Sequence, residues 1–453
     1  MVTVDQLAIS MPMNGEDRTI LPQISFAARA GEIVAVVGGS GAGKTSLLVA
    51  LGGGADWWLP GARITGGITV FGAKPTTNDL EQRHSLVTQN ASSQFSGFKS
   101  TAEGELAVPL EMRGAEPRAI AAEVQLLAAR LGLEQHLDSP LEHLSGGQVA
   151  RLNIGAALIS RPRLLLLDQA HSELDPAFRV ELIQQLKEYF RDQKAVCIMT
   201  ALPGELDGTL FDRRVYLGSP EGAEFASPAR SRTSKAATDA VPVLRVRDLW
   251  FRYSDNHPFL LQGLSFQVSR GEGMFLLGRN GAGKSTIGKL LSRWIAPTRG
   301  EIVFPQEKEN AFAKKNGRPM AGFGFQNPDY MFCRPTVKEE LTIGRYHGPE
   351  SEFAELTEIL GLKQHLAENP FALARHVRKR LSVALAARAR PPLVFLDEPS
   401  QLQDGAGLSK VAEAMEFLRG IGLGVICVTH DPRLISRLNS YETIDLDAQA
   451  KDN

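Results

Sequence analysis

The feature that most constrains this chain is a glycine-rich stretch that occurs twice. The run GEIVAVVGGSGAGKTSLL (residues 31–48) returns as GEGMFLLGRNGAGKSTIG (residues 271–288), which makes Lys44 and Lys284 equivalent. Later runs return in the same order, SRPRLLLLDQ as ARPPLVFLDE and AVCIMTA as GVICVTH. Repetition on this scale indicates two copies of one folding unit.

Each copy alternates apolar, strand-like runs with helical stretches such as PRAIAAEVQLLAARLGL. This alternation predicts an α/β fold with a largely parallel sheet. The stretch between the copies is rich in Ser, Ala, Gly, Pro and charge and has no apolar periodicity, which predicts a flexible linker. We therefore expect one domain over residues 1–217, a linker over 218–242 and a second domain over 243–453.

Composition excludes several classes of protein. The 50 basic and 51 acidic residues nearly cancel, so no global basic excess indicates a nucleic-acid partner. No apolar run approaches the roughly 18 to 20 residues needed to cross a bilayer, and the N-terminus lacks the pattern of a signal peptide. Cys197 and Cys427 lie in apolar runs, and with Cys333 they form no C-x-x-C pair, which favours thiols in a reducing cytosol over metal ligands or disulfides.

Both glycine-rich stretches match G-x-x-x-x-G-K-[ST] between an expected strand and an expected helix, the context of a phosphate-binding P-loop. Glycines let backbone N–H groups surround phosphates, and the helix N-terminus adds partial positive charge. A chance match is excluded by two occurrences at equivalent places, so we predict binding of a nucleoside triphosphate. The expected ligand-binding residues are Gly38, Ser40, Gly41, Gly43, Lys44, Thr45 and Ser46 in the first copy and Gly278, Asn280, Gly281, Gly283, Lys284, Ser285 and Thr286 in the second.

The motif LSGGQ at residues 144–148, followed by Arg151 and then by LLLLD, lies after the first P-loop. This order resembles the ATP-binding cassette (ABC) ATPases, and the resemblance covers both halves apart from the linker. It implies two P-loop domains, each with an antiparallel β-subdomain and a helical signature subdomain, that pair head to tail. Each ATP would lie between the P-loop of one cassette and the signature of the other, here Ser145, Gly146 and Gly147, because serine and glycines at a helix N-terminus can approach a γ-phosphate.

The resemblance also implies a magnesium site in each half. Its expected ligands are Thr45, Asp168 and Gln89 in the first half, and Ser285, Asp397 and Gln326 in the second. Asp168 and Asp397 end the strands of the Walker B motif, and the two glutamines match the Q-loop, which links the magnesium site to a membrane partner.

The catalytic residues that the resemblance implies belong to the second half. Glu398 matches the general base and His430 the switch histidine, with Lys284 and Gln326 assisting. Tyr253 matches the aromatic residue that stacks on adenine, and the alternative for this residue is an aromatic in the core or on a strand face.

The two halves depart from the family pattern in complementary ways. The first half has Gln169 for the base, Ala201 for the switch histidine and Met13 where the second has Tyr253, but its signature is intact. The second half has LARHV (residues 373–377) in place of the signature. One shared site therefore has every part, and the other has lost base, switch and signature together. We expect hydrolysis only at the complete site, with the other keeping ATP bound.

FGFQNPDYMF and TVKEELTIG in the second half resemble the ATPases of energy-coupling factor importers of vitamins or transition metals. This implies a peripheral protein on the cytoplasmic face of the cell membrane, partnered by an integral membrane coupling subunit and a substrate-binding membrane subunit. Trp57 and Trp58 either contact such a partner or pack beside the β-subdomain. The alternatives are the tandem ATPase of a sugar importer, which usually keeps its first half catalytic, and a soluble ribosome-associated tandem ATPase.

Overall fold

The computed structural model divides into two units, Met1–Glu224 and Phe225–Asn453. The residues that it describes are 1–13, 16–89, 94–172, 174, 176–203, 205, 210–217, 241–254, 258–279, 281–305, 319–344 and 348–449. Most of the expected linker, residues 218–240, lies outside them. The expected α/β fold is confirmed in both units, each of which combines a parallel and an antiparallel sheet.

A five-stranded parallel sheet forms the centre of the first unit among its described residues, in the order β5-β6-β7-β3-β8. Its strands are β3 (Ile33–Gly38), β5 (His84–Val87), β6 (Leu164–Asp168), β7 (Val196–Ala201) and β8 (Arg213–Leu217). A three-stranded antiparallel sheet has the order β2-β1-β4, with strands β1 (Val2–Met13), β2 (Glu16–Ala28) and β4 (Arg63–Val70).

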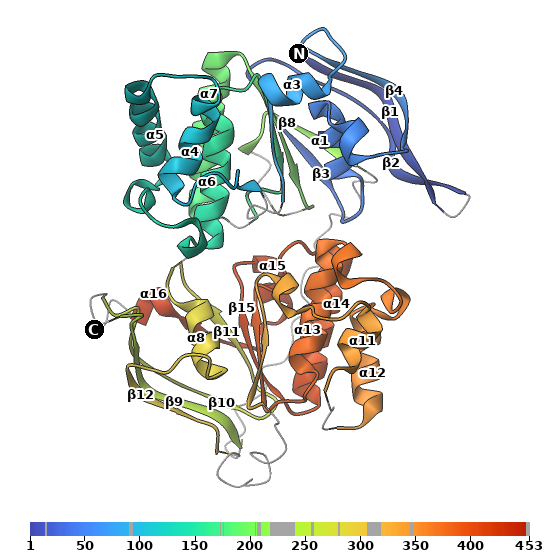
Figure 1. Cartoon of the computed structure of the whole chain (residues 1–453). Helices are drawn as coiled ribbons and strands as arrows, with labels where there is room; N and C mark the ends of the chain where they lie inside the picture. The colour runs from blue at the N-terminus through green and yellow to red at the C-terminus, as the bar shows by residue number, and fades with distance from the viewer. Residues whose placement is uncertain are drawn as a thin grey trace. The chain divides into compact units, whose positions relative to one another are not determined.

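The helices of the first unit lie on both sides of its parallel sheet (Figure 1). They are α1 (Lys44–Gly52), α2 (Ala55–Trp58), α3 (Thr77–Gln82), α4 (Ala102–Glu111), α5 (Pro117–Leu131), α6 (Gly146–Ile159) and α7 (Pro176–Gln193), with short 3-10 turns η2 (Glu134–His136) and η3 (Leu141–His143). Helices α4, α5 and α6 pack on one another and lie on the flank of the parallel sheet away from β1, β2 and β4.

The second unit repeats this plan. Its parallel sheet has the order β13-β14-β15-β11-β16, and its antiparallel sheet the order β10-β9-β12. The strands are β9 (Pro242–Phe251), β10 (Leu261–Ser269), β11 (Gly273–Leu277), β12 (Arg299–Val303), β13 (Ala321–Gly324), β14 (Leu393–Asp397), β15 (Gly424–Val428) and β16 (Glu442–Asp445). The helices are α8 (Lys284–Leu291), α11 (Val337–Thr342), α12 (Glu350–Ile359), α13 (Arg375–Ala387), α14 (Gly405–Gly420), α15 (Pro432–Arg437) and α16 (Leu446–Gln449), with 3-10 turns η6 (Pro328–Met331), η7 (Lys363–His365) and η8 (Pro370–Ala372).

Burial on both faces explains why the central strands are continuously apolar rather than alternating. Along β3, Ile33, Ala35 and Val37 pack into one core, while Val34 and Val36 pack into another on the opposite face. The polar residues that come after these strands therefore emerge together at the carboxyl edge of the sheet, where a ligand site forms in open α/β sheets.

Two expectations about single residue types are settled by burial. Cys197 and Cys427 are buried thiols in β7 and β15, as expected, and Cys333 is exposed. Trp57 and Trp58 are 62% and 47% exposed, so neither ring is buried in the core of the first unit. None of the helices in the described part of the chain has the length and apolar character needed to span a membrane.

Candidate functional site

The candidate phosphate loop of the second unit runs from the end of β11 to the first residue of α8. Gly281 and Gly283 have φ of 87° and 93°, a left-handed conformation that L side chains rarely adopt. A Cβ atom at Gly283 would also lie 2.8 Å from Leu261 Cδ2, so this position needs glycine for space as well. Asn280 lies outside the described residues.

Lys284 and Ser285 begin α8 and face the end of β14. The buried Lys284 donates from Nζ to the carbonyl oxygens of Gly278 (2.5 Å) and Arg279 (2.9 Å). Ser285 Oγ donates to Asp397 Oδ2 at 2.6 Å. A hydroxyl beside a carboxylate is a donor set that fits Mg²⁺, which prefers oxygen ligands.

Glu398 and His430 come after the neighbouring strands β14 and β15. Glu398 donates its backbone N–H to Val428 O (2.9 Å) and has a φ of 50°. Its Oε2 accepts from His430 N at 3.4 Å, and its Oε1 lies 3.8 Å from His430 Nε2. Burial, reinforced by the charge of Asp397, raises the pKa of Glu398 to about 7, against the opposing charge of Lys284 and a second lysine. A carboxylate in this range is suited to proton transfer near neutral pH.

Tyr253 lies beyond the end of β9 and is 60% exposed, which excludes the alternative of a core aromatic. Its Oη hydrogen-bonds with Thr286 Oγ1 at 2.9 Å, which places the ring over the first turn of α8. Gln326 lies two residues after β13 and is half-buried. An exposed ring beside a phosphate loop can stack on a base. Gln326 follows β13, which is the neighbour of β14, the strand that ends at Asp397.

The first unit reproduces the phosphate loop closely. Lys44 Nζ donates to Gly38 O and Gly39 O, both at 2.8 Å, and Thr45 Oγ1 donates to Asp168 Oδ2 at 2.5 Å. Gly41 and Gly43 have φ of 80° and 85°, as in the second unit. Ser40 and Ser46 occupy the same loop and the first turn of α1.

The first unit differs where the second has Glu398 and His430. Gln169 has the same φ of 50°, but its Oε1 accepts a hydrogen bond from Gln89 Nε2. Ala201 ends the buried strand β7 and offers no side chain to a phosphate. An amide held in this way can orient water but is a far weaker proton acceptor than a carboxylate. Met13 ends β1, and its side chain lies outside the described part of the chain.

The signature motif lies at the N-terminus of α6. Ser145 is the exposed N-cap, and it forms a reciprocal capping box with Gln148. Gly146 and Gly147 form the first turn without side chains. The equivalent N-cap of α13 is Ala374, which makes no side-chain cap hydrogen bond. This difference matches the LARHV replacement.

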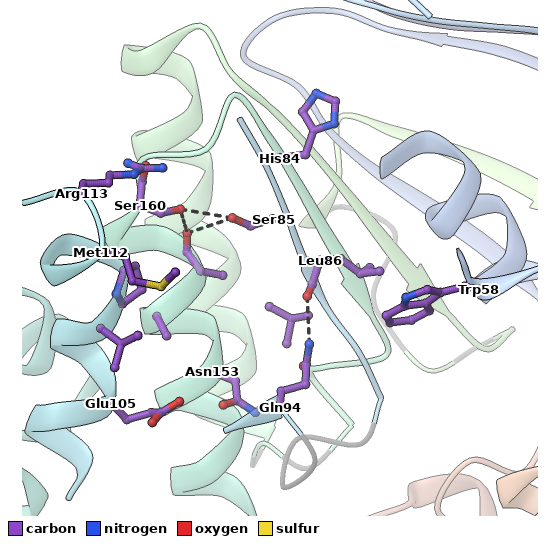
Figure 2. Close-up of a pocket in the computed structure, with 15 residues that line it drawn as sticks. Trp58, His84, Ser85, Leu86, Gln94, Glu105, Met112, Arg113, Asn153 and Ser160 are labelled. Carbon is purple, nitrogen blue, oxygen red and sulfur yellow. Dashed lines mark hydrogen bonds between the residues drawn. The ribbon is translucent and has the colours of Figure 1, made fainter. Parts of the chain in front are cut away.

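A groove that the sequence pattern does not predict lies in the first unit, between the parallel sheet and helices α4 and α6. It has a volume of about 740 Å³, and Trp58, Gln94 and Met112 lie around it (Figure 2). Gln94 donates to Leu86 O (3.0 Å) and accepts from Thr88 N (2.8 Å), which ties the groove to the residue before Gln89. Trp58, the second residue of the aromatic pair at 57–58, is the sequence signal that belongs to this groove.

The sequence motifs also do not identify the second lysine, whose positive charge lowers the pKa of Glu398 against the effect of burial. This residue is Lys379, which is 2% exposed and lies on α13. Lys379 belongs to the basic run HVRKR (residues 376–380), which overlaps the end of the replaced signature. A lysine among the buried positions of that helix was the available signal, since buried lysines require partners.

Comparison with known proteins gives consistent results. A sequence family described as ABC transporter matches residues 21–172 and 261–401, more than half of the chain. The "Putative HMP/thiamine import ATP-binding protein YkoD" of Bacillus subtilis (strain 168) is 26% identical over 96% of this chain and 88% of its own length. A "Putative ABC transporter ATP-binding protein" of Methanosarcina acetivorans is also 26% identical, over 96% of this chain and 82% of its own.

Two solved structures resemble the whole chain in fold. One, titled "RNase-L Inhibitor", has a TM-score of 0.62 and 19% identity, and the match covers 96% of this chain and 86% of the other. The other comes from a complex of archaeal ribosomal stalk protein aP1 and archaeal ribosome recycling factor aABCE1, with a TM-score of 0.61, 19% identity and coverage of 95% and 85%. At this identity the likeness extends to the fold alone.

Proposed function

This chain belongs to the ABC transporter family, and on that premise we propose that it is the ATP-hydrolysing subunit of a membrane importer with one competent site. The observation that carries the proposal is the contrast between the units at one backbone position. Glu398 and Gln169 share a φ of 50° after equivalent strands, but only Glu398 has a carboxylate beside a histidine. Hydrolysis needs that carboxylate.

The second unit's residues divide the work of phosphoryl transfer. Lys284 would leave its two carbonyl partners to neutralise charge on the transferred phosphate, and Glu398 would orient and activate the attacking water. His430 would hold the γ-phosphate from the neighbouring strand. Mg²⁺, bound by Ser285, Asp397 and Gln326, would supply further neutralisation of the phosphates.

The first unit would contribute its signature residues to ATP held by the second unit. Ser145, Gly146 and Gly147 open a helix whose N-terminus favours an anion, whereas Ala374 in the second unit offers no hydroxyl. The complementary losses support this pairing, because base, switch and signature are all missing from the other set. ATP at the first unit would remain bound and help hold the two cassettes together.

Two substitutions test the assignment of hydrolysis. Glu398→Gln should abolish steady-state phosphate release, because the amide cannot accept a proton from water. Gln169→Glu is the matched control at the equivalent position and should add little, since Ala201 still provides no switch histidine. Robust hydrolysis by Glu398→Gln would overturn the proposal.

A chain of contacts in the first unit supports coupling to a membrane partner. The groove that Trp58 and Met112 flank is connected through Gln94 to Thr88, and the adjacent Gln89 contacts Gln169. Trp58 and Met112 are 47% and 80% exposed. A segment seated there could therefore be sensed at the nucleotide site.

The second unit has an exposed aromatic cluster in the corresponding region. Trp294 stacks on Phe325 with a centroid distance of 5.2 Å, and Phe325 contacts Tyr330 edge-on. Trp294 and Tyr330 are 52% and 73% exposed. Phe325 and Tyr330 belong to the FQNPDYMF stretch that resembles energy-coupling factor ATPases. An importer of a vitamin or transition metal, with this chain peripheral at the membrane, accounts for these surfaces.

Affinity purification from a detergent extract separates this function from a ribosome-associated one. The wild-type chain should retain hydrophobic membrane proteins, and Met112→Glu should lose them because it places a charge at the groove. Leu126→Glu, on the exposed face of α5, is the matched control and should leave retention intact. Recovery of ribosomal proteins in place of membrane proteins would favour the alternative.

A further inference from the structure

Helix α13 occupies the place of the signature helix in the second unit. Two consecutive residues of this helix, Arg378 and Lys379, form hydrogen bonds within their own unit. Lys379 is 2% exposed, and its Nζ donates to Phe325 O and Asp397 O, both at 3.0 Å. The ammonium group of Lys379 thereby connects Phe325, which precedes Gln326, to Asp397 at the end of β14. Burying an ammonium group is costly unless such partners are fixed.

Arg378 holds the same segment at its other end. Its Nη1 donates to both carboxylate oxygens of Asp329, at 2.8 Å and 2.9 Å, and its Nε donates to Leu373 O at 2.9 Å. The Arg378 and Asp329 side chains are 17% and 27% exposed, so the pair is largely shielded from solvent. Charge-assisted hydrogen bonds of this kind are the stronger ones in proteins.

The first unit lacks these anchors at the equivalent positions of its signature helix. Val149 and Ala150 are buried there and carry no cation. The anchored unit is the one with Glu398, and the unit without them has Gln169. The two cations of α13 and the carboxylate of Glu398 therefore occur in the same unit of the chain, and the other unit has neither.

We propose that Arg378 and Lys379 are positioning residues that fix the segment from Phe325 to Asp329, and with it Gln326, against the end of β14. The helix that has lost its signature thus serves the competent site of its own unit. Gln326 lies between the two anchors, so its freedom is limited from both ends. The inference rests on the proposed function, because it assigns these residues to the hydrolytic site.

Removing one anchor should reduce turnover without a matching loss of nucleotide binding. Lys379→Met removes both hydrogen bonds of the ammonium group and should lower kcat at least about tenfold, while KM for ATP changes less than about threefold. Lys379→Arg should recover part of the loss because it keeps the cation. Asp329→Asn, a milder change at a half-buried residue, should lower kcat in the same direction and covers the case in which Lys379→Met does not fold.

Arg380→Met provides the control for loss of a buried cation on the same helix. Arg380 donates to Leu360 O and has no bond to the segment between Phe325 and Asp329 among those described, so kcat per folded molecule should stay within about twofold. Hydrogen exchange gives a second readout without nucleotide: the peptide over residues 321–331 should lose protection in Lys379→Met and keep it in Arg380→Met.

Glu398→Gln measured in parallel separates the two ideas. If Glu398→Gln is inactive while Lys379→Met and Asp329→Asn keep wild-type kcat and protection, the positioning role is wrong and the proposed function stands. If Glu398→Gln remains active, the proposed function itself fails. Equal losses in Lys379→Met and Arg380→Met would reduce Lys379 to a residue that only stabilises the helix.

Discussion

At the residue scale, the two candidate sites differ by few side chains on nearly identical backbones. Lys44 and Lys284 each donate to the two carbonyl oxygens of the loop, and Thr45 and Ser285 each donate to the Walker B aspartate. In the proposed function, hydrolysis therefore depends on the residue directly after β6 and its counterpart after β14. An amide occupies the first of these positions and a carboxylate the second.

The first unit also brings a buried histidine close to a half-buried carboxylate, two residues after Gln169. His171 is fully buried, and its Nε2 lies 3.4 Å from Glu205 Oε1. Burial alone would raise the pKa of Glu205, but the charges of His171 and Arg179 and the N–H of Leu202 lower it to about 2. Glu205 Oε2 accepts from Leu202 N at 2.9 Å, so the pair fastens the turn after β7 to the turn after β6.

We predict that Glu205→Gln destabilises the first unit in a pH-dependent way. A carboxyl whose pKa is depressed on folding contributes its full stability above the unfolded value, which is 4.5, and loses it as the pH falls toward 2. The variant should therefore lose about 2 to 3 kcal/mol of unfolding free energy near pH 6, and the difference from wild type should shrink below about pH 4.5. Denaturant unfolding of the full chain across this range measures it. A difference in unfolding free energy that is constant with pH would contradict the view that the ionised Glu205 carboxylate stabilises the folded unit.

Single residues also show what sequence can and cannot predict. The P-loop and Walker B residues were identifiable because each belongs to a short motif with fixed spacing. Lys379 was not, because its partners are the backbone carbonyl groups of Phe325 and Asp397, and a carbonyl group has no sequence signal. The His171–Glu205 pair was missed because its two members lie on different turns that only the sheet brings together.

At the element scale, the N-terminus of α6 combines two functions in one residue. Ser145 caps the helix through Gln148, and the proposed function also places its hydroxyl against a γ-phosphate. Loss of a cap and loss of a phosphate contact would both reduce activity, so substitution by alanine alone cannot separate them.

A pair of substitutions separates the two roles of Ser145. Ser145→Ala should lower the unfolding free energy by about 1 kcal/mol through loss of the cap. Ser145→Asp should keep that stability, because aspartate caps equally well, but its carboxylate should repel the phosphate and abolish hydrolysis. Thermal unfolding and phosphate release are the two measurements. Wild-type hydrolysis by Ser145→Asp would exclude a phosphate contact at this residue.

The order of elements was predictable from the repeat, whereas the groove was not. Alternating apolar and helical runs predicted the parallel sheet because both faces of strands such as β3 are buried. The groove depends on how far α4 and α6 stand from β5, which is a packing distance that the pattern of Leu and Ala along those helices does not encode.

At the scale of the whole molecule, the proposed function assigns unequal tasks to two similar units. Both units keep the lysine, the hydroxyl and the aspartate that we propose hold a triphosphate with magnesium, but the first has Gln169 and Ala201 where the second has Glu398 and His430. Binding without turnover at the first unit is the expected consequence of this inequality. A molecule built in this way can release phosphate from one nucleotide while a second nucleotide remains bound.

The last prediction concerns this unequal retention of nucleotide. The full chain, loaded with radiolabelled ATP and Mg²⁺ and passed through a desalting column, should retain roughly one unhydrolysed ATP per molecule, because binding and turnover depend on different groups. Lys44→Ala should lose this retained ATP, whereas Lys284→Ala should keep it and lose turnover, because each lysine lies in one phosphate loop only. Chelation of Mg²⁺ should release the label from the wild-type chain and from Lys284→Ala. Retention of label that is unaffected by Lys44→Ala and abolished by Lys284→Ala would place the stable nucleotide in the second unit, and the division of labour between the units would then have to be reversed.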